Sequence, residues 1–276
     1  MRRLTVLATV LSAIALAPPA GAAPRAESPA PEAAVLRDPV PCVGCWQPPL
    51  VTSWQWQLQG NVDTSLDVDM FDIDGFEATK SLVQAIHSKG AAAVCYVDAG
   101  SWEDWRSDAD DFPQRVLGRS NGWPGERWLD VRAMKVLRPI MRARIEMCAN
   151  KGFDGVEFDL VDGYLNNTGF PLTGADQLRY DVWLANTAHS YGMSAALKND
   201  LPQIATLLDY FDYSVNEQCF QYHECANLDL FVGAGKAVFQ VEYKLDTSDF
   251  CPKANARNYN SLKKELSLRV WRVACR

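Results

Sequence analysis

Short apolar runs alternate with longer amphipathic runs along most of this chain. The short runs are rich in β-branched and aromatic residues and are typical of buried strands. We predict strands at Ser53–Leu58, Asp67–Ile73, Ala91–Val97, Arg127–Leu129, Gly155–Phe158, Met193–Leu197, Phe211–Val215 and Ala237–Val241. The amphipathic runs predict helices at Phe76–Lys89, Met134–Asn150, Gln177–Tyr191, Leu201–Leu208 and Leu228–Ala234. Gly90 and Gly192 follow two of these helices, where glycine commonly ends a helix.

This alternation predicts an α/β protein. Eight strands that are mostly separated by helices favour a parallel sheet closed into a (β/α)8 TIM-type barrel, in a single domain. A doubly wound open sheet is the alternative. No Gly-x-Gly-x-x-Gly follows the first strand, so the sequence gives no sign of a dinucleotide, and we expect no cofactor.

Polar residues follow most of the predicted strands. Because the carboxyl ends of barrel strands meet at one rim, these side chains are expected to share a site. They are Asp72, Asp74, Asp98, Asp130, Asp159, Asp162, Lys198, Asn199, Asp200, Glu217 and Glu242.

The most informative stretch is 152–164, a short buried strand that runs into an acidic loop. Glu157 and Asp159 are two residues apart and share a face of the strand, and Asp162 lies beyond its end. Several acids at one strand end repel one another, which favours a functional reason for the arrangement. A solvated acidic loop, or one that caps the next helix, is the structural alternative.

The N-terminus has the features of an export signal. Arg2 and Arg3 precede an apolar run that ends at Ala17, and a small-residue site follows with cleavage after Ala22. We therefore predict a signal peptide at residues 1–22, an Ala/Pro-rich linker at 23–44 and the barrel domain at 45–276. The protein is expected to be secreted and monomeric.

The formal net charge of −7 disfavours binding to nucleic acid or to an anionic membrane, and favours a cationic ligand. Acidity for solubility alone is the simpler explanation. The eight cysteines of an exported chain indicate disulfides. We expect Cys219–Cys225 and Cys251–Cys275, and we pair the remainder as Cys42–Cys45 and Cys95–Cys148. A zinc site at Cys42 and Cys45 is the competing interpretation, and we expect no metal.

A rim rich in carboxylates, without a Gly-x-Ser-x-Gly motif, favours glycoside hydrolysis, which needs two carboxyl groups. The three histidines lie in helices or a small loop and are interpreted as structural. Aromatic rings bind sugar faces, and we select Trp102 and Tyr164 because both lie in loops after strand ends.

Seven segments give the chain a resemblance to the endo-α-1,4-polygalactosaminidases, glycoside hydrolase family 114. In family order they are 54–58, 94–103, 127–130, 152–164, 197–199, 215–219 and 241–243. The resemblance implies a barrel that hydrolyses α-1,4-linked galactosamine polymers, with Asp159 and Glu217 as the catalytic pair. Phe158 and Leu160 stand where the family motif has Pro and Asn.

The resulting hypothesis makes Asp159 the nucleophile and Glu217 the acid/base of a retaining enzyme. Reversed roles and an inverting mechanism both stay open. The predicted substrate-binding residues are Asp72, Asp98, Trp102, Asp130, Glu157, Asp162, Tyr164, Lys198, Asn199 and Glu242. Three alternatives are a catalytically impaired amino-sugar-binding barrel, an α-glycosidase acting on another galactose-type polysaccharide, and a metal-dependent deacetylase.

Overall fold

The computed structural model describes residues 36–276. The predicted signal peptide and most of the predicted linker lie outside the described residues. Residues 36–44 contact helix α3 (Gly174–Ser190), where Val40 N donates to Asn186 Oδ1 at 2.7 Å. They also contact Tyr210, whose hydroxyl donates to the Arg37 carbonyl at 2.8 Å. The packed part of the chain therefore begins before the predicted boundary at residue 45.

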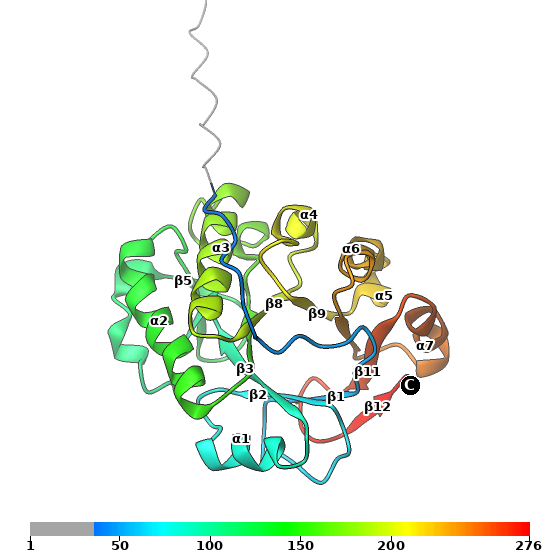
Figure 1. Ribbon diagram of the computed structural model, residues 1–276. Helices are drawn as coiled ribbons and strands as arrows, with labels where there is room; N and C mark the ends of the chain where they lie inside the picture. Colours follow the sequence, from blue (N-terminus) through cyan, green and yellow to red (C-terminus); the bar gives the residue numbers. More distant parts are fainter. Residues whose placement is uncertain (1–35) are drawn as a thin grey trace, which may run out of the picture. The chain divides into compact units, whose positions relative to one another are not determined.

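Eight parallel strands form a barrel with helices outside it (Figure 1). In sheet order they are β1 (Trp54–Gln57), β2 (Met70–Asp74), β3 (Ala92–Asp98), β7 (Gly155–Asp159), β8 (Ser194–Lys198), β9 (Tyr213–Glu217), β10 (Val238–Glu242) and β11 (Tyr259–Lys264). A ninth strand, β12 (Arg272–Ala274), pairs antiparallel with β11. The predicted TIM-type barrel is confirmed.

The barrel closes through the segment that joins β11 to β12, because β1 has no parallel partner on that side. Leu58 N donates to Leu268 O at 3.0 Å, and Gln55 Nε2 donates to Val270 O at 2.7 Å. Arg272 adds a bond to the Trp54 carbonyl at 3.0 Å. Residues from both ends of the described chain therefore form this seam.

The helices cover the outside of the sheet. Besides α3 they are α1 (Lys80–His87), α2 (Met134–Lys151), α4 (Ile204–Leu207), α5 (Cys219–Tyr222), α6 (Asp229–Gly233) and α7 (Thr247–Ala256). Short 3₁₀ turns are η1 (Ala109–Asp111), η2 (Gln114–Val116), η3 (Gly163–Leu165), η4 (Leu201–Gln203) and η5 (Cys225–Leu228). Thr173 and Asp176 form a capping box that starts α3, and Gly152 ends α2 in the left-handed conformation. Among residues 36–276, no helix is long and apolar enough to cross a bilayer.

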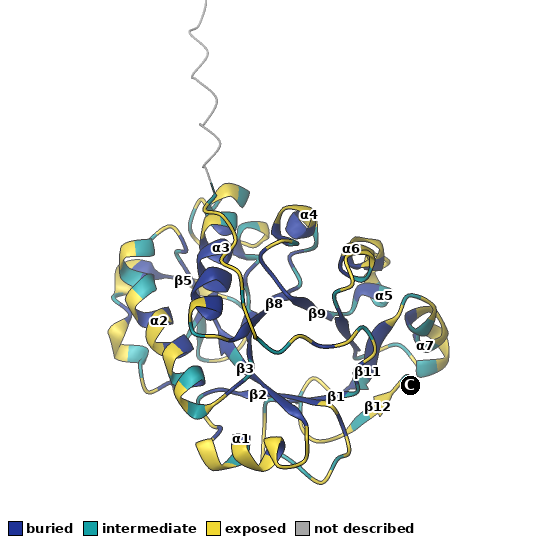
Figure 2. Cartoon of the chain, in the orientation of Figure 1, coloured by how far each residue is buried: buried dark blue, intermediate teal, exposed yellow. Residues whose placement is uncertain are grey.

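Burial separates two apolar clusters on the two faces of the strands. The eight barrel strands are almost entirely buried, and the helices expose their outer faces (Figure 2). Trp54, Met70 and Phe239 belong to the cluster inside the barrel, while Phe71, Cys95 and Phe158 belong to the larger cluster between sheet and helices. Because side chains alternate along a strand, this parity determines which polar residues reach the barrel mouth.

One strand that we predicted for the barrel belongs to a separate three-stranded sheet. Residues 127–129 belong to β6 (Glu126–Leu129), which pairs antiparallel with β4 (Ser101–Glu103) and β5 (Leu117–Ser120) in an insertion after β3. The eighth barrel strand is β11, which we did not predict, because its Tyr-Asn-Ser-Leu-Lys-Lys sequence carries buried polar side chains.

All four predicted disulfides are present. Cys95–Cys148 ties β3 to α2, Cys219–Cys225 closes a six-residue step, Cys251–Cys275 attaches the C-terminal segment to α7, and Cys42–Cys45 lies in the N-terminal segment. Cys42 and Cys45 are thus joined to each other, which corrects the zinc interpretation.

Candidate active site

A cavity of about 370 Å³ opens at the carboxyl ends of the barrel strands. Asp159 from β7, Lys198 from β8 and Glu217 from β9 lie at its floor, because each ends its strand with the parity that faces the barrel interior. Trp56 and Tyr243 complete the floor, and the β4–β6 insertion contributes Trp105 and Trp123 to the wall.

Lys198 is the centre of the floor. Its Nζ lies 2.9 Å from Asp159 Oδ1, 3.1 Å from Glu157 Oε1 and 3.3 Å from Glu217 Oε2. The ammonium also sits 4.6 Å from the centroid of the Trp56 ring. Burial acts to lower the pKa of Lys198, but the surrounding carboxylates outweigh burial and raise it well above its usual range. The surrounding carboxylates therefore favour the charged form of Lys198.

Asp159 is held as an anion. It accepts hydrogen bonds from the Tyr96 hydroxyl at 2.7 Å and from the Leu160 amide at 2.8 Å, besides Lys198. Burial acts to raise the pKa of Asp159, but Lys198, Tyr96 and the Leu160 amide together lower it. Its side chain keeps 17% of its surface exposed to the cavity, so an ionised carboxylate faces any bound molecule.

Glu217 lies across Lys198 from Asp159. The Tyr243 hydroxyl donates to its Oε1, and its side chain is 27% exposed. Since Lys198 Nζ is 2.9 Å from Asp159 Oδ1 and 3.3 Å from Glu217 Oε2, these two oxygens are separated by no more than the sum of the distances, 6.2 Å. The two carboxyl groups predicted as a pair therefore face one small space.

The strands that carry these side chains leave the barrel through strained residues. Leu160, Asn199 and Gln218 follow β7, β8 and β9 with φ of 57°, 51° and 62°. The left-handed conformation is uncommon outside glycine and clusters at functional sites. Here the left-handed conformation turns the chain sharply after each strand. The Asn199 side chain also accepts a hydrogen bond from the Glu217 amide at 3.0 Å.

Two acids lie beneath the floor rather than in the cavity. Asp72 and Glu157 are fully buried inside the barrel, and neither lines the opening. Burial raises the pKa of both groups, and the negative charge of Glu157 raises that of Asp72 further. Glu157 therefore supports Lys198 from below, with Asp72 buried beside it.

Asp162 reaches the cavity from the loop after β7. Burial and the neighbouring charge of Asp159 raise its pKa to about 6. This carboxyl group can hold or release a proton near neutral pH.

The sequence profile of glycoside-hydrolase family GH114 matches residues 42–276. The chain belongs to this family. Ega3 of Aspergillus fumigatus, solved in complex with galactosamine, is 38% identical with a TM-score of 0.80, and the match covers 83% of this chain and 97% of Ega3. This GH114 protein is accordingly a glycoside hydrolase that acts on O-glycosyl bonds.

Two further relatives are more distant. The glycoside hydrolase domain of PelA from Pseudomonas aeruginosa is 13% identical with a TM-score of 0.64, over 82% of this chain and 99% of that domain, which supports the fold. An uncharacterized protein of Deinococcus radiodurans is 27% identical over 229 residues, which are 70% of this chain and 72% of the relative.

Several predicted substrate-binding residues of this GH114 enzyme do not line the catalytic cavity. Asp98 is buried and accepts the Gly100 and Ser101 amides. The Trp102 indole donates to Ala109 O at 3.0 Å. Tyr164 donates to Asp200 at 3.0 Å and lies outside the floor.

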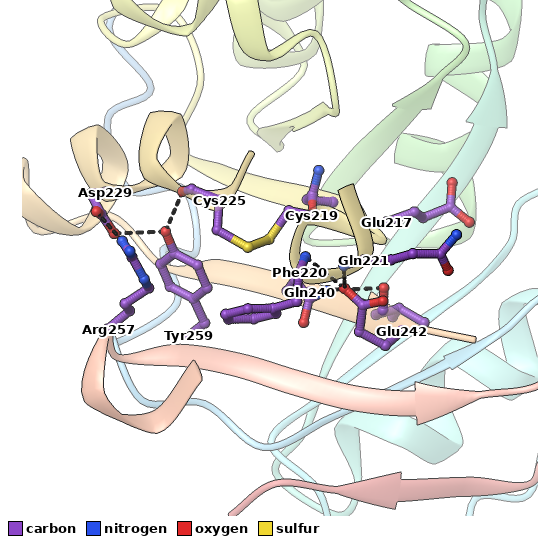
Figure 3. The surroundings of a disulfide bond; sticks show 12 residues. Glu217, Cys219, Phe220, Gln221, Cys225, Asp229, Gln240, Glu242, Arg257 and Tyr259 are labelled. Carbon is purple, nitrogen blue, oxygen red and sulfur yellow. Dashed lines mark hydrogen bonds and ion pairs between the residues drawn. A yellow bond between two sulfur atoms is a disulfide. The ribbon is translucent and has the colours of Figure 1, made fainter. Parts of the chain in front are cut away.

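Asp130 and Glu242 are also placed elsewhere, each for a topological reason. Asp130 follows β6 of the small sheet and binds Arg132 at 2.7 Å. Glu242 ends β10 with its side chain on the outer face of the sheet, where it accepts a hydrogen bond from the Phe220 amide at 2.9 Å (Figure 3). The next residue, Tyr243, faces the cavity instead.

The sequence analysis did not select several lining residues as site residues, and parity could have identified two of them. Tyr96 lies two residues before Asp98 on β3, and Tyr243 follows Glu242, so counting in steps of two from inward-facing residues identifies both. Trp105, Trp123 and Glu126 belong to the insertion, which gave no comparable signal.

The two departures from the family motif have different consequences. Phe158 is fully buried in the cluster between sheet and helices, so its side chain does not reach the catalytic cavity. Leu160 lines the cavity and holds the left-handed conformation, in which asparagine is better tolerated than leucine.

Proposed function

We propose that this GH114 enzyme cleaves α-1,4-linked galactosamine polymers within the chain, with Asp159 and Glu217 as the catalytic pair. The observation that carries the proposal is the bridged pair itself: two carboxyl groups no more than 6.2 Å apart at the floor of an open cavity. The likeness to Ega3, solved with galactosamine, supports the choice of sugar.

The spacing favours a retaining mechanism. Carboxyl groups about 5–5.5 Å apart serve retention, and about 6.5–9.5 Å is needed for the water of an inverting reaction. Asp159 attacks the anomeric carbon while Glu217 protonates the glycosidic oxygen, so the linkage breaks and a glycosyl-enzyme ester forms. Glu217 then deprotonates a water molecule, which attacks the anomeric carbon and releases Asp159.

The local charges fit these roles. Lys198 and Tyr96 keep Asp159 ionised, as a nucleophile requires, and Tyr243 orients Glu217 by its hydroxyl. Asp162 and Asn199 line the same space and are proposed to contact the substrate. Glu157 and Asp72 act through Lys198.

The walls suit an amino sugar. Trp105 and Trp123 are 53% and 54% exposed, so part of each ring is open to pack on pyranose rings. Glu126 and Asp162 add carboxyl groups that attract the ammonium group of unacetylated galactosamine, whereas Glu103 is paired with Arg106.

Export from the cell is part of the proposal. Four disulfides are stable in an oxidising compartment and are rare in a reducing cytosol. Their presence therefore supports a secreted enzyme.

The experiment measures release of reducing ends from polygalactosamine by the wild-type enzyme and by Asp159→Asn. We expect Asp159→Asn to reduce kcat by at least about 10³-fold, because the amide cannot form the ester. Melting temperature checks that the variant is folded. Asp130→Asn is the matched control, since Asp130 lies outside the cavity, and it should keep wild-type activity.

The assay also separates the alternatives. Wild-type activity by Asp159→Asn would refute the assignment of the nucleophile. Cleavage of a neutral galactose polysaccharide, with none of polygalactosamine, would replace the proposed substrate. Binding of polygalactosamine without released ends would favour an impaired enzyme.

A further inference from the structure

The aromatic wall of the catalytic cavity does not belong to the barrel itself. Trp105 and Trp123 lie on two turns of the insertion, one after β4 and one between β5 and β6. Asp104 N donates to Gly125 O at 3.0 Å, so the two turns contact each other. We call these two turns the tip of the insertion. The position of the wall relative to the floor therefore depends on how this tip is attached to the barrel.

Arg106 attaches the tip to the barrel. Its side chain is 5% exposed and binds carboxylates from two different elements. Nη1 and Nη2 donate to Asp74, which ends β2, at 2.9 and 2.8 Å. Nε donates to Glu103, which ends β4, at 2.7 Å, and Nη2 lies 2.7 Å from the other oxygen of that carboxylate. Arginine thus binds each carboxylate through two nitrogens, a geometry that lysine cannot reproduce.

The same guanidinium lies beside the wall. Its Cζ is 6.0 Å from the centroid of the Trp105 ring and 4.7 Å from that of Phe76, which follows β2. Trp105 precedes Arg106 in the chain, and both residues line the catalytic cavity. Holding Arg106 against the end of β2 therefore restricts the turn that carries Trp105.

A close approach to Gly125 also confines Trp105. A Cβ on Gly125 would lie 2.8 Å from Trp105 Cζ3. Gly125 has a φ of 84°, in the left-handed region that favours glycine. The ring is thus in contact with one turn of the tip while its own turn is held by Arg106.

Without Arg106 the attachment of the tip would become a repulsion. Asp74 and Glu103 are 8% and 2% exposed. Arg144 remains 3.9 Å from Glu103, whereas Asp74 has no other ion-pair partner among residues 36–276. Because two buried carboxylates of like charge repel each other, we expect the tip to move away from β2 and to carry Trp105 with it.

We propose that Arg106 is a positioning residue that fixes Trp105 as the sugar-packing wall of the catalytic cavity. Arg106 takes no part in bond cleavage, because Asp159, Lys198 and Glu217 contact one another without it. It acts on the binding of the polysaccharide through Trp105. This assignment rests on the proposed function, since polygalactosamine is the polymer that the wall would hold.

The test is a double-mutant cycle on polygalactosamine. Arg106→Met and Trp105→Ala should each raise KM about fivefold and change kcat less than about twofold, because the floor is intact. The double variant should have the KM of Trp105→Ala alone, because Arg106 acts through that ring. Arg257→Met is the control and should keep the wild-type KM, since it breaks an ion pair with Asp229 of α6, outside the cavity.

Two further variants keep the test decisive if Arg106→Met does not fold. Gly125→Ala displaces the Trp105 ring and leaves the ion pairs in place, so it should raise KM, with no further effect in the Trp105→Ala background. Arg106→Lys keeps a charge between the carboxylates but loses the paired contacts. It should therefore melt above Arg106→Met while its KM stays raised. A wild-type KM for both further variants would overturn the role of Arg106.

The outcomes separate this proposal from the proposed function. Effects of Arg106→Met and Trp105→Ala on KM that multiply in the double variant overturn the role of Arg106 alone. No cleavage of polygalactosamine by the wild-type enzyme contradicts the proposed function. In that case, binding of the polymer that is weakened equally by either single variant and by the double variant still supports Arg106, and binding unchanged by Arg106→Met overturns it.

Discussion

Lys198 is the single side chain on which the chemistry of this barrel depends. Its ammonium lies within 3.3 Å of three carboxylates and is 1% exposed. Removing one member of a buried ion cluster leaves uncompensated charge, which typically costs about 3–5 kcal/mol. The cluster is therefore expected to couple the stability of the fold to the ionisation of the site.

Lys198→Met should move the acidic limb of the pH–rate profile to higher pH. Without the ammonium, burial dominates and the pKa of Asp159 rises, so the nucleophile loses its charge at a higher pH. The position of the acidic limb is measured from initial rates on polygalactosamine between about pH 4 and 8. This range brackets ordinary carboxyl and histidine pKa values.

For Lys198→Met we also predict that the loss in the free energy of unfolding depends on pH. Carboxyl groups whose folded pKa exceeds the unfolded value stabilise the fold at low pH, and this contribution is lost as pH rises. Urea unfolding should therefore show a larger loss at about pH 8 than at about pH 4. Arg132→Met, which removes a half-exposed ion pair with Asp130, is the control and should cost at most about 1 kcal/mol. Equal losses at both pH values would contradict the account of Lys198.

The sequence was sufficient to locate the strand ends that form the floor of the site. It was not sufficient to tell which side chains at those ends point into the cavity. Asp159 and Glu217 are strand-end residues of inward parity, so the expectation of a shared rim applied to them. Glu242 was selected by the same rule but lies one position away from the cavity-facing Tyr243, because side-chain direction depends on position along the strand and not on proximity to the strand end. Register is set by neighbouring strands, which a local pattern does not contain.

The contact between the ends of β3 and β7 depends on one glycine. A Cβ on Gly100 would lie 1.8 Å from the Leu160 carbonyl oxygen, so only glycine allows the two loops to meet beside the nucleophile. Gly100 N and Ala99 N both donate to Asp159 O at 3.1 Å, which fixes the backbone of the nucleophile.

Gly100→Ala should destabilise the protein by about 1–3 kcal/mol, because the backbone must shift to accommodate the methyl group. Since the shift displaces Asp159, we expect kcat to fall more than KM changes. Chemical denaturation and steady-state kinetics measure the two effects.

The control for that variant lies on α6. Gly233 has no atom within 4 Å of an added Cβ, so Gly233→Ala should be neutral or slightly stabilising. If the two alanine variants were equally stable, the close approach of β3 and β7 would not matter as argued.

Seven of the eight barrel strands could be predicted, because their apolar runs are buried on both faces. β11 could not, since Asn260 and Lys264 satisfy their buried polar groups in long-range contacts. Asn260 accepts the Thr52 amide, and Lys264 Nζ donates to Gln55 Oε1, 209 positions away. β6 shares the apolar character of a barrel strand but pairs with its own insertion.

The whole molecule is acidic, and the catalytic cavity is more so. Its lining includes seven acidic residues against Lys198 and Arg106; they are Asp74, Glu77, Glu103, Glu126, Asp159, Asp162 and Glu217. The field of such a cavity concentrates a polycation and is screened by salt.

Raising the ionic strength from about 0.01 M to about 1 M shortens the screening length from about 30 Å to about 3 Å. We therefore expect KM for fully deacetylated polygalactosamine to rise by at least about tenfold over this range, while kcat changes little. A partly acetylated polymer, which carries fewer charges, is the control substrate and should show a weaker dependence. A salt-independent KM for the deacetylated polymer would mean that charge does not guide binding.

The seam between β1 and β12 has a consequence for how the enzyme is made. Leu266, Ser267 and Leu268 wall the catalytic cavity, and Leu268 holds Leu58 through the backbone. A ribosome delivers residues 54–58 long before residues 266–268, so the nascent chain cannot enclose its own cavity during most of translation. The catalytic cavity can therefore be enclosed only after residues 266–268 have been synthesised and have reached β1.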